Sequence, residues 1–465
     1  IERGDFDGNG TEDLLITNGN SHLIVTLDNC KEEFLLKKIY DGIGNLSEIN
    51  YKPLTHNDVF YPNNSVAYSF PLIYDVIPAL YVVKELKGPD GIGGLNTTQY
   101  SYRGIRIHKQ GRGFLGFGEI TTLLLNKNRK VINTYSINTT PYIFLPELYS
   151  TEERTLNDIP ISLTLNNYNY EVYDNNIFSR RFFKYLSSST NHDFATNKIV
   201  TTNYTYNPTD IHYGNVSTIT TNYNNEFTET KLYLYTSEGS WCPSKISELT
   251  ILKQEAGQPS FSRKVNYYYK TNGLLEFEKT DLDKPAKSVI TEYRYNNLGN
   301  VSDIIISAPD LLETRTTHYD YDSKGRFVVK TINPMGFISE SEYDSRTGNI
   351  IHTKDINNLE TFYKYDGFGR LIEITLPTTK KITNTLSFCD GTNPTHSRYS
   401  LLTQTEGFPY VKKYFDCLGR EIRTETTNYN GNVLFTDKLY DTRGLLIETT
   451  EPYVAGAPHL TTNYD

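Results

Sequence analysis

The stretch Tyr365-Asp366-Gly367-Phe368-Gly369-Arg370 decides the fold of this chain, because variants of it recur along the sequence. The glycines that end six such copies stand at positions 299, 325, 348, 369, 419 and 444. They follow one another at intervals of 21 to 26 residues, with one interval of about twice that length. Such a period predicts a supersecondary unit stacked many times. The C-terminal part of the chain is therefore expected to be a repeat structure.

Each unit can be interpreted physically as a β-hairpin. An Asp followed three residues later by Gly suits a type I turn, because Asp accepts hydrogen bonds from its own turn and Gly tolerates a positive φ. Residues 361–365 and 371–375 on either side of one turn are rich in strand-forming side chains. The linkers between units carry breakers such as Asn333-Pro334-Met335-Gly336. Stacked hairpins predict a long, wound sheet.

The composition agrees with a broad, thin sheet. Only 37% of the 465 residues are hydrophobic, yet 38 of them are tyrosines. Tyrosine covers a neighbour with its ring while its hydroxyl stays in contact with water. No long amphipathic helix is evident, so we expect an almost entirely β protein with very little helix.

Charge and cysteine content exclude several classes of function. A net charge of −9 disfavours nucleic acid as a partner. No apolar run approaches 18 residues, so no transmembrane helix is expected. Four scattered cysteines form no Cys-x-x-Cys pair, and we expect mostly free thiols rather than a disulfide framework or a metal site. These cysteines are Cys30, Cys242, Cys389 and Cys417.

The two ends of the sequence suggest a piece of a longer or processed chain. It begins at Ile1 without an initiating Met or a signal peptide. It ends at Tyr464-Asp465, which is the start of another repeat unit. We therefore expect the last sheet edge to be continued by further residues or by a partner, since an open edge leaves backbone groups unpaired.

An acidic loop near the N-terminus has the spacing of a calcium-binding loop. Oxygen ligands fall at loop positions 1, 3, 5, 7 and 9, and Gly10 stands at position 6 where a sharp turn is needed. The twelfth position is Ile16 instead of the bidentate Glu of an EF-hand, and the flanking residues read as strands. The expectation is Ca²⁺ in a loop between two strands, and the alternative is a metal-free Asp/Asn/Gly turn. The expected ligands are Asp5, Asp7, Asn9, Thr11 through its carbonyl, and Asp13.

The following region carries glycine-rich signatures. Tyr40-Asp41-Gly42-Ile43-Gly44-Asn45 is followed later by Asp90-Gly91-Ile92-Gly93-Gly94. Gly111-x-Gly113-x-x-Gly116 also matches the dinucleotide-binding fingerprint. We reject nucleotide binding, because that fingerprint requires a helix after it and residues 119–125 are β-branched and short.

Four regions follow from these patterns. Residues 1–38 hold the calcium-loop hairpin, and residues 39–135 form a middle region. Residues 136–290 carry tyrosines in i, i+2 pairs, which share one face of a strand and indicate divergent repeats. Residues 291–465 hold the clear repeats.

The repeats resemble the RHS or Tyr-Asp (YD) repeats of bacterial toxins and of some animal cell-surface proteins. The acidic loop resembles the FG-GAP repeats of integrin-like β-propellers. The middle region is similar to that of SpvB-like proteins and of the B component of insecticidal toxin complexes. The order of the three signatures resembles such a B component over essentially the whole chain. The resemblance implies an all-β fold in which RHS/YD hairpins wind into a large hollow sheet shell, preceded by the end of an integrin-like β-propeller.

The same resemblance implies a function and partners. The chain would be a non-enzymatic, secreted wall segment of a toxin-encapsulating shell. A companion RHS-repeat C component would complete the cavity and supply a cytotoxic C-terminal enzyme. A pore-forming A component would receive that payload.

Two other classes of function remain open. A cell-surface adhesion or carbohydrate-binding module is the second hypothesis, since similar repeats occur on cell surfaces. A carbohydrate-active enzyme on a β scaffold is the third, because paired carboxylates meet in space and not in sequence. The chain has neither His-Glu-x-x-His nor Gly-x-Ser-x-Gly, so no catalytic motif supports an enzyme.

Overall fold

The computed structural model describes residues 1–19, 21–26, 35–61, 73–74, 77–108, 113–138, 144–172, 182–206, 214–238 and 242–464. Within them the chain is almost entirely strand. The helical segments of these residues are the 3-10 turns η1 (Leu125–Lys127) and η3 (Pro285–Lys287). The expectation of an all-β protein is therefore confirmed.

A small antiparallel sheet stands apart from the main one. It consists of β1 (Glu2–Gly4), β2 (Asp13–Asn18) and β3 (Ser21–Val25), in the order β1-β2-β3. The acidic loop connects β1 to β2, so it joins two strands as the sequence predicts.

All other described strands belong to one large sheet. Its first part is β4 (Lys38–Tyr40), β5 (Leu46–Pro53), β6 (Phe60–Tyr61), β7 (Ile73–Tyr74), β8 (Tyr81–Pro89), β9 (Leu95–His108) and β10 (Gly113–Leu124). Long strands follow: β11 (Arg129–Asn138), β12 (Leu145–Arg154), β13 (Pro160–Val172), β14 (Phe182–Asp193), β15 (Lys198–Tyr206), β16 (Val216–Tyr223), β17 (Phe227–Glu238) and β18 (Cys242–Glu255). Shorter strands come next: β19 (Phe261–Tyr269), β20 (Leu275–Thr280), β21 (Val289–Tyr295), β22 (Val301–Ser307), β23 (Arg315–Tyr321), β24 (Val328–Ile332), β25 (Ile338–Tyr343), β26 (Ile350–Lys354) and β27 (Glu360–Tyr365). The last are β28 (Leu371–Thr375), β29 (Lys381–Phe388), β30 (Tyr399–Thr405), β31 (Val411–Phe415), β32 (Glu421–Thr427), β33 (Val433–Tyr440), β34 (Leu446–Thr450), β35 (Tyr453–Val454) and β36 (Thr461–Asn463).

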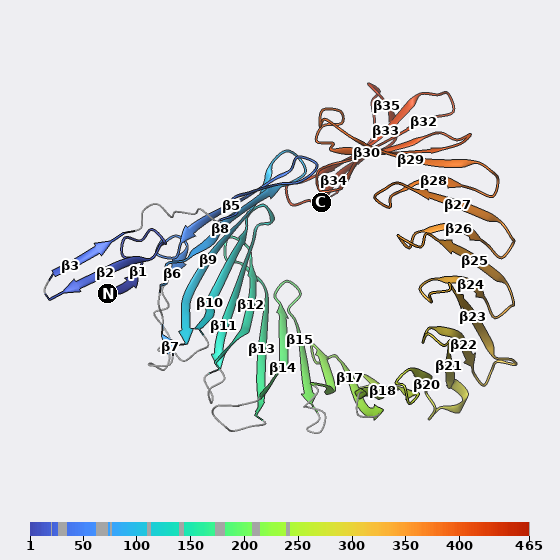
Figure 1. The fold of residues 1–465 in the computed structure, drawn as a ribbon, viewed down its shortest axis with the longest axis horizontal. Coiled ribbons are helices and arrows are strands. Elements are labelled where there is room, and N and C mark those ends of the chain that lie inside the picture. Colours follow the sequence, from blue (N-terminus) through green and yellow to red (C-terminus); the bar gives the residue numbers. More distant parts are fainter. Residues whose placement is uncertain are drawn as a thin grey trace.

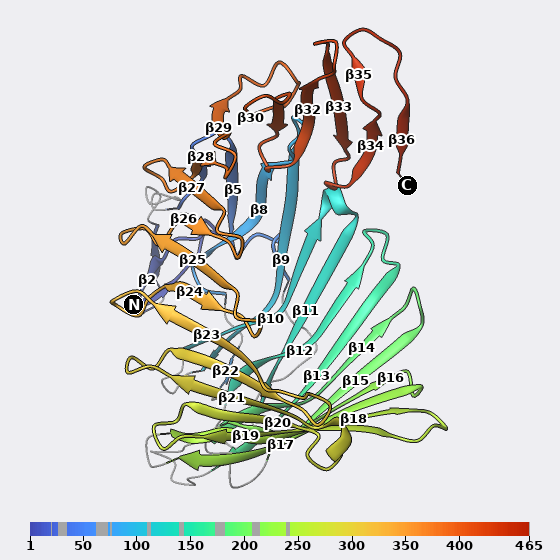
Figure 2. The same ribbon diagram turned by 90° about the vertical axis from the view of Figure 1, so that its right-hand side faces the viewer.

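The large sheet curls into a ring. From β8 to β34 each strand pairs antiparallel with its neighbour in the chain, and the strands follow one another around the ring in Figure 1. The hairpin of β5 and β8 returns to lie beside the C-terminal strands around β30 to β34. Figure 2 shows the ring from the side, with the long strands β10 to β16 running steeply and β19 to β27 running across them. The predicted wound sheet is thus present.

The repeat turn has the predicted chemistry. The Asp366 carboxylate accepts the backbone N–H groups of Phe368 and Arg370, both at 2.9 Å. Gly369 donates its N–H to the Asp366 carbonyl at 3.0 Å and has φ +79°. The register shifts at Tyr365, so the loop is a type I turn closed by a β-bulge. The predicted positive φ is also present at Gly325, Gly419 and Gly444.

The linkers between hairpins use the same turn. The Asn333 side chain accepts the N–H groups of Met335 and Phe337, at 2.9 and 3.0 Å, and Asp355 and Asn428 cap their turns in the same way. The residues that sequence reasoning treats only as breakers are therefore tight turns in their own right. Consecutive hairpins merge into one continuous meander.

Buried apolar side chains are concentrated in the middle region. One cluster is Leu54, Val59, Phe60, Val82 and Ile105, with Tyr102 and Phe117 packed against it. A second cluster is Leu115, Ile137 and Phe144. Beyond residue 144 the buried hydrophobic side chains of the described residues are Val265 and Tyr414. The rest of the ring is a single layer without a core of its own.

Candidate functional site

The acidic loop brings its three expected carboxylate ligands together. Asp5, Asp7 and Asp13 each offer a carboxylate oxygen, and these oxygens lie within 4.8 Å of one another. Asn9 donates its side-chain N–H to Asp7 at 2.7 Å. The backbone N–H of Thr11 donates to the Asn9 side-chain oxygen at 2.8 Å. The carboxylates that the sequence spacing predicts as ligands therefore lie close together in the structure.

The loop is held in place by the middle region. The Thr55 hydroxyl donates to the Gly8 carbonyl at 2.8 Å, and the Tyr81 hydroxyl donates to the Asn9 carbonyl at 2.5 Å. Gly10 has φ +85°, and a Cβ there would lie 2.7 Å from Pro53 and from the Tyr81 ring. Glycine is therefore needed at position 10 for both its backbone angle and its close approach to β5 and β8.

The loop retains unused capacity for a cation. Asp13 is wholly buried, and its Oδ2 accepts the N–H of Phe6 at 2.9 Å. Asp5 Oδ2 accepts the N–H of Gly10 at 2.7 Å, while Asp5 Oδ1 is buried without a hydrogen-bond partner. A buried carboxylate oxygen without a partner is costly unless a cation or water satisfies it. The donor set, made of hard oxygens, fits Ca²⁺.

A second recurring contact links several of the hairpins to the one before them. The Tyr365 hydroxyl donates to the Ile350 carbonyl at 2.9 Å, and Ile350 follows directly after the preceding repeat turn. The same contact is made by Tyr235 to Val216, Tyr269 to Ile246, Tyr295 to Leu275, Tyr321 to Val301 and Tyr440 to Glu421. The tyrosine of the Tyr-Asp pair therefore bonds the neighbouring hairpin, while the aspartate closes its own turn.

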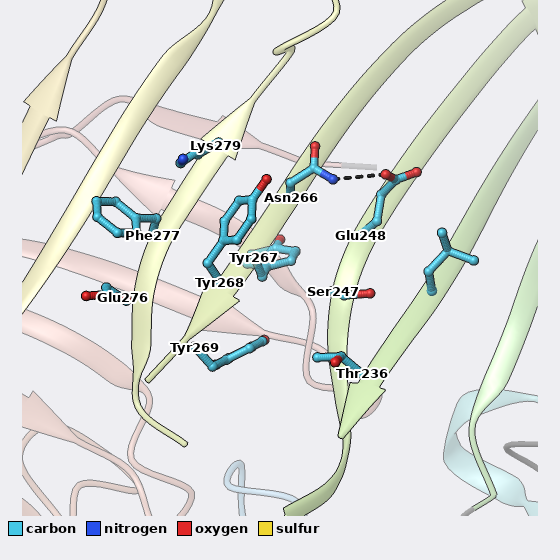
Figure 3. A pocket seen from close by; sticks show the side chains of 11 residues that line it. Thr236, Ser247, Glu248, Asn266, Tyr267, Tyr268, Tyr269, Glu276, Phe277 and Lys279 are labelled. Atoms are coloured by element: carbon cyan, nitrogen blue, oxygen red, sulfur yellow. Dashed lines mark hydrogen bonds between the residues drawn. The ribbon is translucent and has the colours of Figure 1, made fainter. Parts of the chain in front are cut away.

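An aromatic hollow lies on one face of β17 to β20. It measures about 500 Å³ and is lined by residues that include Leu234, Glu248, Asn266, Tyr268 and Lys279. Figure 3 shows the last four of these side chains. Two of the five, Leu234 and Tyr268, are exposed. Together with Phe277, they give an open surface that combines rings with charged groups.

The polar groups of this hollow are bonded to one another. Asn266 donates to Glu248 at 2.9 Å, and Lys264 contacts the other Glu248 oxygen at 3.0 Å. The Lys279 ammonium lies 4.6 Å from the Tyr268 ring centre and 5.0 Å from that of Phe277. This mutual pairing favours packing or ligand stacking over proton transfer. No sequence motif pointed to the hollow, because four strands contribute to it.

The first part of the chain matches a known family. Residues 2–140 match the family model described as the insecticide toxin TcdB middle/N-terminal region. No curated protein matches. The matched residues include the acidic loop, the glycine-rich turns at residues 40–45 and 90–94, and the buried cluster around Ile105.

Solved structures match nearly the whole chain. The crystal structure of TcdB2–TccC3 aligns with a TM-score of 0.62 at 12% identity, over 97% of this chain and 33% of that chain. The Photorhabdus luminescens Tc holotoxin pore aligns with a TM-score of 0.63 at 11% identity, over 97% and 34%. The chain resembles a Tc toxin B component. It spans about a third of the length of the solved chains that it matches.

The B-component-like character and the expected all-β fold with one large antiparallel sheet are thus confirmed. In the described residues no helix is long and apolar enough to cross a membrane. Cys389 and Cys417 are free thiols as expected, whereas Cys30 and the side chain of Cys242 lie outside the described residues. Gly113 and Gly116 of the rejected fingerprint lie in strand β10, and Gly111 lies outside the described residues.

Proposed function

We propose that this chain is a non-enzymatic wall segment of a hollow shell in an insecticidal toxin complex. The observation that carries the proposal is a single-layer sheet curled into a ring, in which the described residues beyond 144 include almost no buried apolar side chain. A sheet of this kind can bound a space, whereas an ordinary domain fills its interior with side chains. The solved structures with this fold include TcdB2–TccC3 complexes and a Tc holotoxin pore.

The proposal assigns distinct roles to partners. A companion RHS-repeat C component would continue the sheet and donate a cytotoxic C-terminal enzyme to the enclosed space. A pore-forming A component would receive that enzyme. The chain itself would supply geometry alone: a secreted wall that keeps its client from solvent and from its substrate.

The test uses the full-length protein together with its companion repeat protein. Electron microscopy of the complex should show a hollow particle, and the C-terminal enzyme of the companion should resist protease until the particle is denatured. A solid particle, or an enzyme cleaved as fast in the complex as alone, would overturn the shell proposal.

A carbohydrate-binding role is the second candidate, and the aromatic hollow favours it. An exposed ring such as Tyr268 beside Glu248 and Asn266 can stack on a sugar and bond its hydroxyls. A glycan array probed with wild type and with Tyr268→Ala would test this. Binding lost in Tyr268→Ala but kept in Tyr149→Ala, an exposed tyrosine elsewhere, would favour adhesion; binding to no glycan would refute it.

We also propose that Asp5, Asp7, Asn9, Thr11 and Asp13 hold Ca²⁺. The ion would neutralise three neighbouring carboxylates and satisfy the unpartnered oxygen of Asp5. Because Thr55 and Tyr81 bond the same loop, binding would fix the small sheet against the ring.

Calorimetry with Ca²⁺ and melting with and without chelator test this site. We expect heat of binding and a lower melting temperature after chelation, both lost in Asp5→Asn. The exposed Asp310→Asn removes the same charge elsewhere and should change neither. Absence of binding heat in the wild type would leave the loop a metal-free turn.

A further inference from the structure

The ring has a seam where the first part of the sheet meets the last. None of the described strand registers pairs residues 38–108 with residues 381–463. Two side-chain hydrogen bonds cross the seam instead. Arg420 Nη2 donates to the Asp90 carbonyl at 2.8 Å, and Asn45 Nδ2 donates to the Cys417 carbonyl at 3.3 Å. Both bonds join glycine-rich turns of the middle region to one repeat turn.

The repeat turn at the seam is capped like its copies but is more deeply buried. Asp416 accepts the N–H groups of Leu418 and Arg420, just as Asp366 does in its own turn. The Asp416 side chain is 0% exposed, whereas the side chains of the equivalent aspartates are 18–26% exposed. Arg420 is 15% exposed, against 54% for Arg370 at the same position. The Asp90–Gly94 turn lies against this buried copy.

The covering turn fits this place closely. Gly91 has φ +84°, and a Cβ there would lie 2.1 Å from Arg420 Nη2 and 2.6 Å from Asp416 Oδ2. A Cβ at Gly93 would lie 2.7 Å from the His396 ring. Asp90 is 3% exposed, and its carboxylate accepts the N–H groups of Ile92 and Gly94. The turn is thus pre-shaped by its own cap to present a backbone carbonyl to Arg420.

Contacts within the repeats fix the orientation of the Arg420 guanidinium. Its Nε donates to Asp416 Oδ2 at 2.6 Å, and its centre lies 4.5 Å from the Tyr440 ring centre. A fixed, partly desolvated guanidinium makes a stronger bond to a carbonyl than a mobile surface arginine. Two cavities, of about 510 and 190 Å³, flank the contact and are lined from both sides of the seam, by Gly91 and His396 among others.

We propose that the Asp90–Gly94 turn clasps the Asp416–Arg420 turn, and that this clasp, rather than strand pairing, holds the ring closed. The partner of this surface is a segment of the same chain, 330 residues away. Opening the ring at the seam would then break none of the strand pairings among the described residues. The inference concerns closure of the ring and holds whether or not the ring encloses a toxin.

Hydrogen exchange on the full chain tests the clasp. In Arg420→Gln, the amides of residues 90–94 should exchange roughly tenfold faster, as expected for loss of a charge-assisted hydrogen bond. The turn at residues 355–359, which has the same capping bonds but is exposed and lies away from the seam, serves as internal reference. Arg370→Gln removes the same repeat arginine at an exposed copy and should leave residues 90–94 unchanged. Equal effects of the two arginine variants, or no change in Arg420→Gln, would overturn the proposal.

Glycine variants give an independent test. Gly91→Ala combines backbone strain with a clash against Arg420, while Gly431→Ala, at φ +80° with nothing within 4 Å, has the strain alone. X-ray scattering should show a larger radius of gyration for Gly91→Ala than for Gly431→Ala, because only the first opens the seam. If Gly91→Ala fails to fold by circular dichroism, Arg420→Gln decides. Equal radii for the two folded variants would count against the clasp.

Discussion

The middle region and the repeats stabilise one sheet in different ways. Residues 54–144 hold both buried clusters, built from irregular pairings that include the parallel pair β6 and β9. Residues 291–465 rely on capped turns, tyrosine-to-carbonyl bonds and ion pairs instead. A single-layer wall has nowhere to bury large apolar side chains, so its stability is distributed over many small polar contacts. Perturbing one contact of each kind should reveal this difference.

The largest effect is expected in the middle region. Ile105 is 0% exposed and belongs to the larger cluster, so Ile105→Ala should lower the free energy of unfolding by about 2–5 kcal/mol. Ile372→Ala, at a side chain 39% exposed in the repeats, should cost less than about 1 kcal/mol. Urea denaturation of both variants measures the difference. Equal losses would mean that the repeats also possess a core.

A partly exposed ion-pair network around Glu421 gives the repeats a pH dependence. Burial alone would raise the pKa of Glu421, but hydrogen bonds from Lys413, Lys438 and Thr424 lower that pKa to about 2. Because the folded pKa lies below the ordinary 4.5, this carboxylate stabilises the fold above about pH 5, and the contribution is lost as pH falls toward 2.

We expect this contribution to be at most ~3 kcal/mol. Melting temperatures measured from pH 7 to pH 2 should fall less steeply for Glu421→Gln than for wild type. The exposed Glu451→Gln is the control. A Glu421→Gln profile parallel to that of wild type would show that the network does not control acid stability.

The repeat glycines test the turn itself. Gly369 has φ +79°, so Gly369→Val should cost about 1–3 kcal/mol through backbone strain. Gly367, two residues earlier in the same turn, has neither a positive φ nor a neighbour within 4 Å, so Gly367→Val should be nearly neutral. Thermal melts of the two variants compare them. If Gly369→Val melts like wild type, the turn assignment is wrong.

What the sequence predicts well is local. The bonds of Asp366 run to residues at i+2 and i+4, and Asp5, Asp7 and Asp13 lie within nine residues, so chain spacing alone predicts both the turn and the acidic cluster. The contact between Arg420 and Asp90 spans 330 residues, and no local pattern marks it. The buried cluster around Ile105 could not be predicted from sequence either, because irregular strand pairing brings its members together. Contacts between residues far apart in the sequence depend on the rotation of each hairpin relative to the preceding one. Amino-acid composition does not determine that rotation.

The smallest effect tests the tyrosine bond between hairpins. Tyr365→Phe removes only the hydroxyl that donates to the Ile350 carbonyl and keeps the ring, so it should cost about 0.5–1.5 kcal/mol. Tyr429→Phe, at a side chain 96% exposed, should change nothing measurable. The same bond recurs in at least five other hairpins. When the Tyr295 and Tyr321 hydroxyls are removed as well, the three losses of unfolding free energy should therefore be nearly additive. Thermal melts of the single and triple variants provide the measurement. If the triple variant is as stable as wild type, these tyrosines stabilise the repeats through packing of their rings and not through their hydroxyl groups.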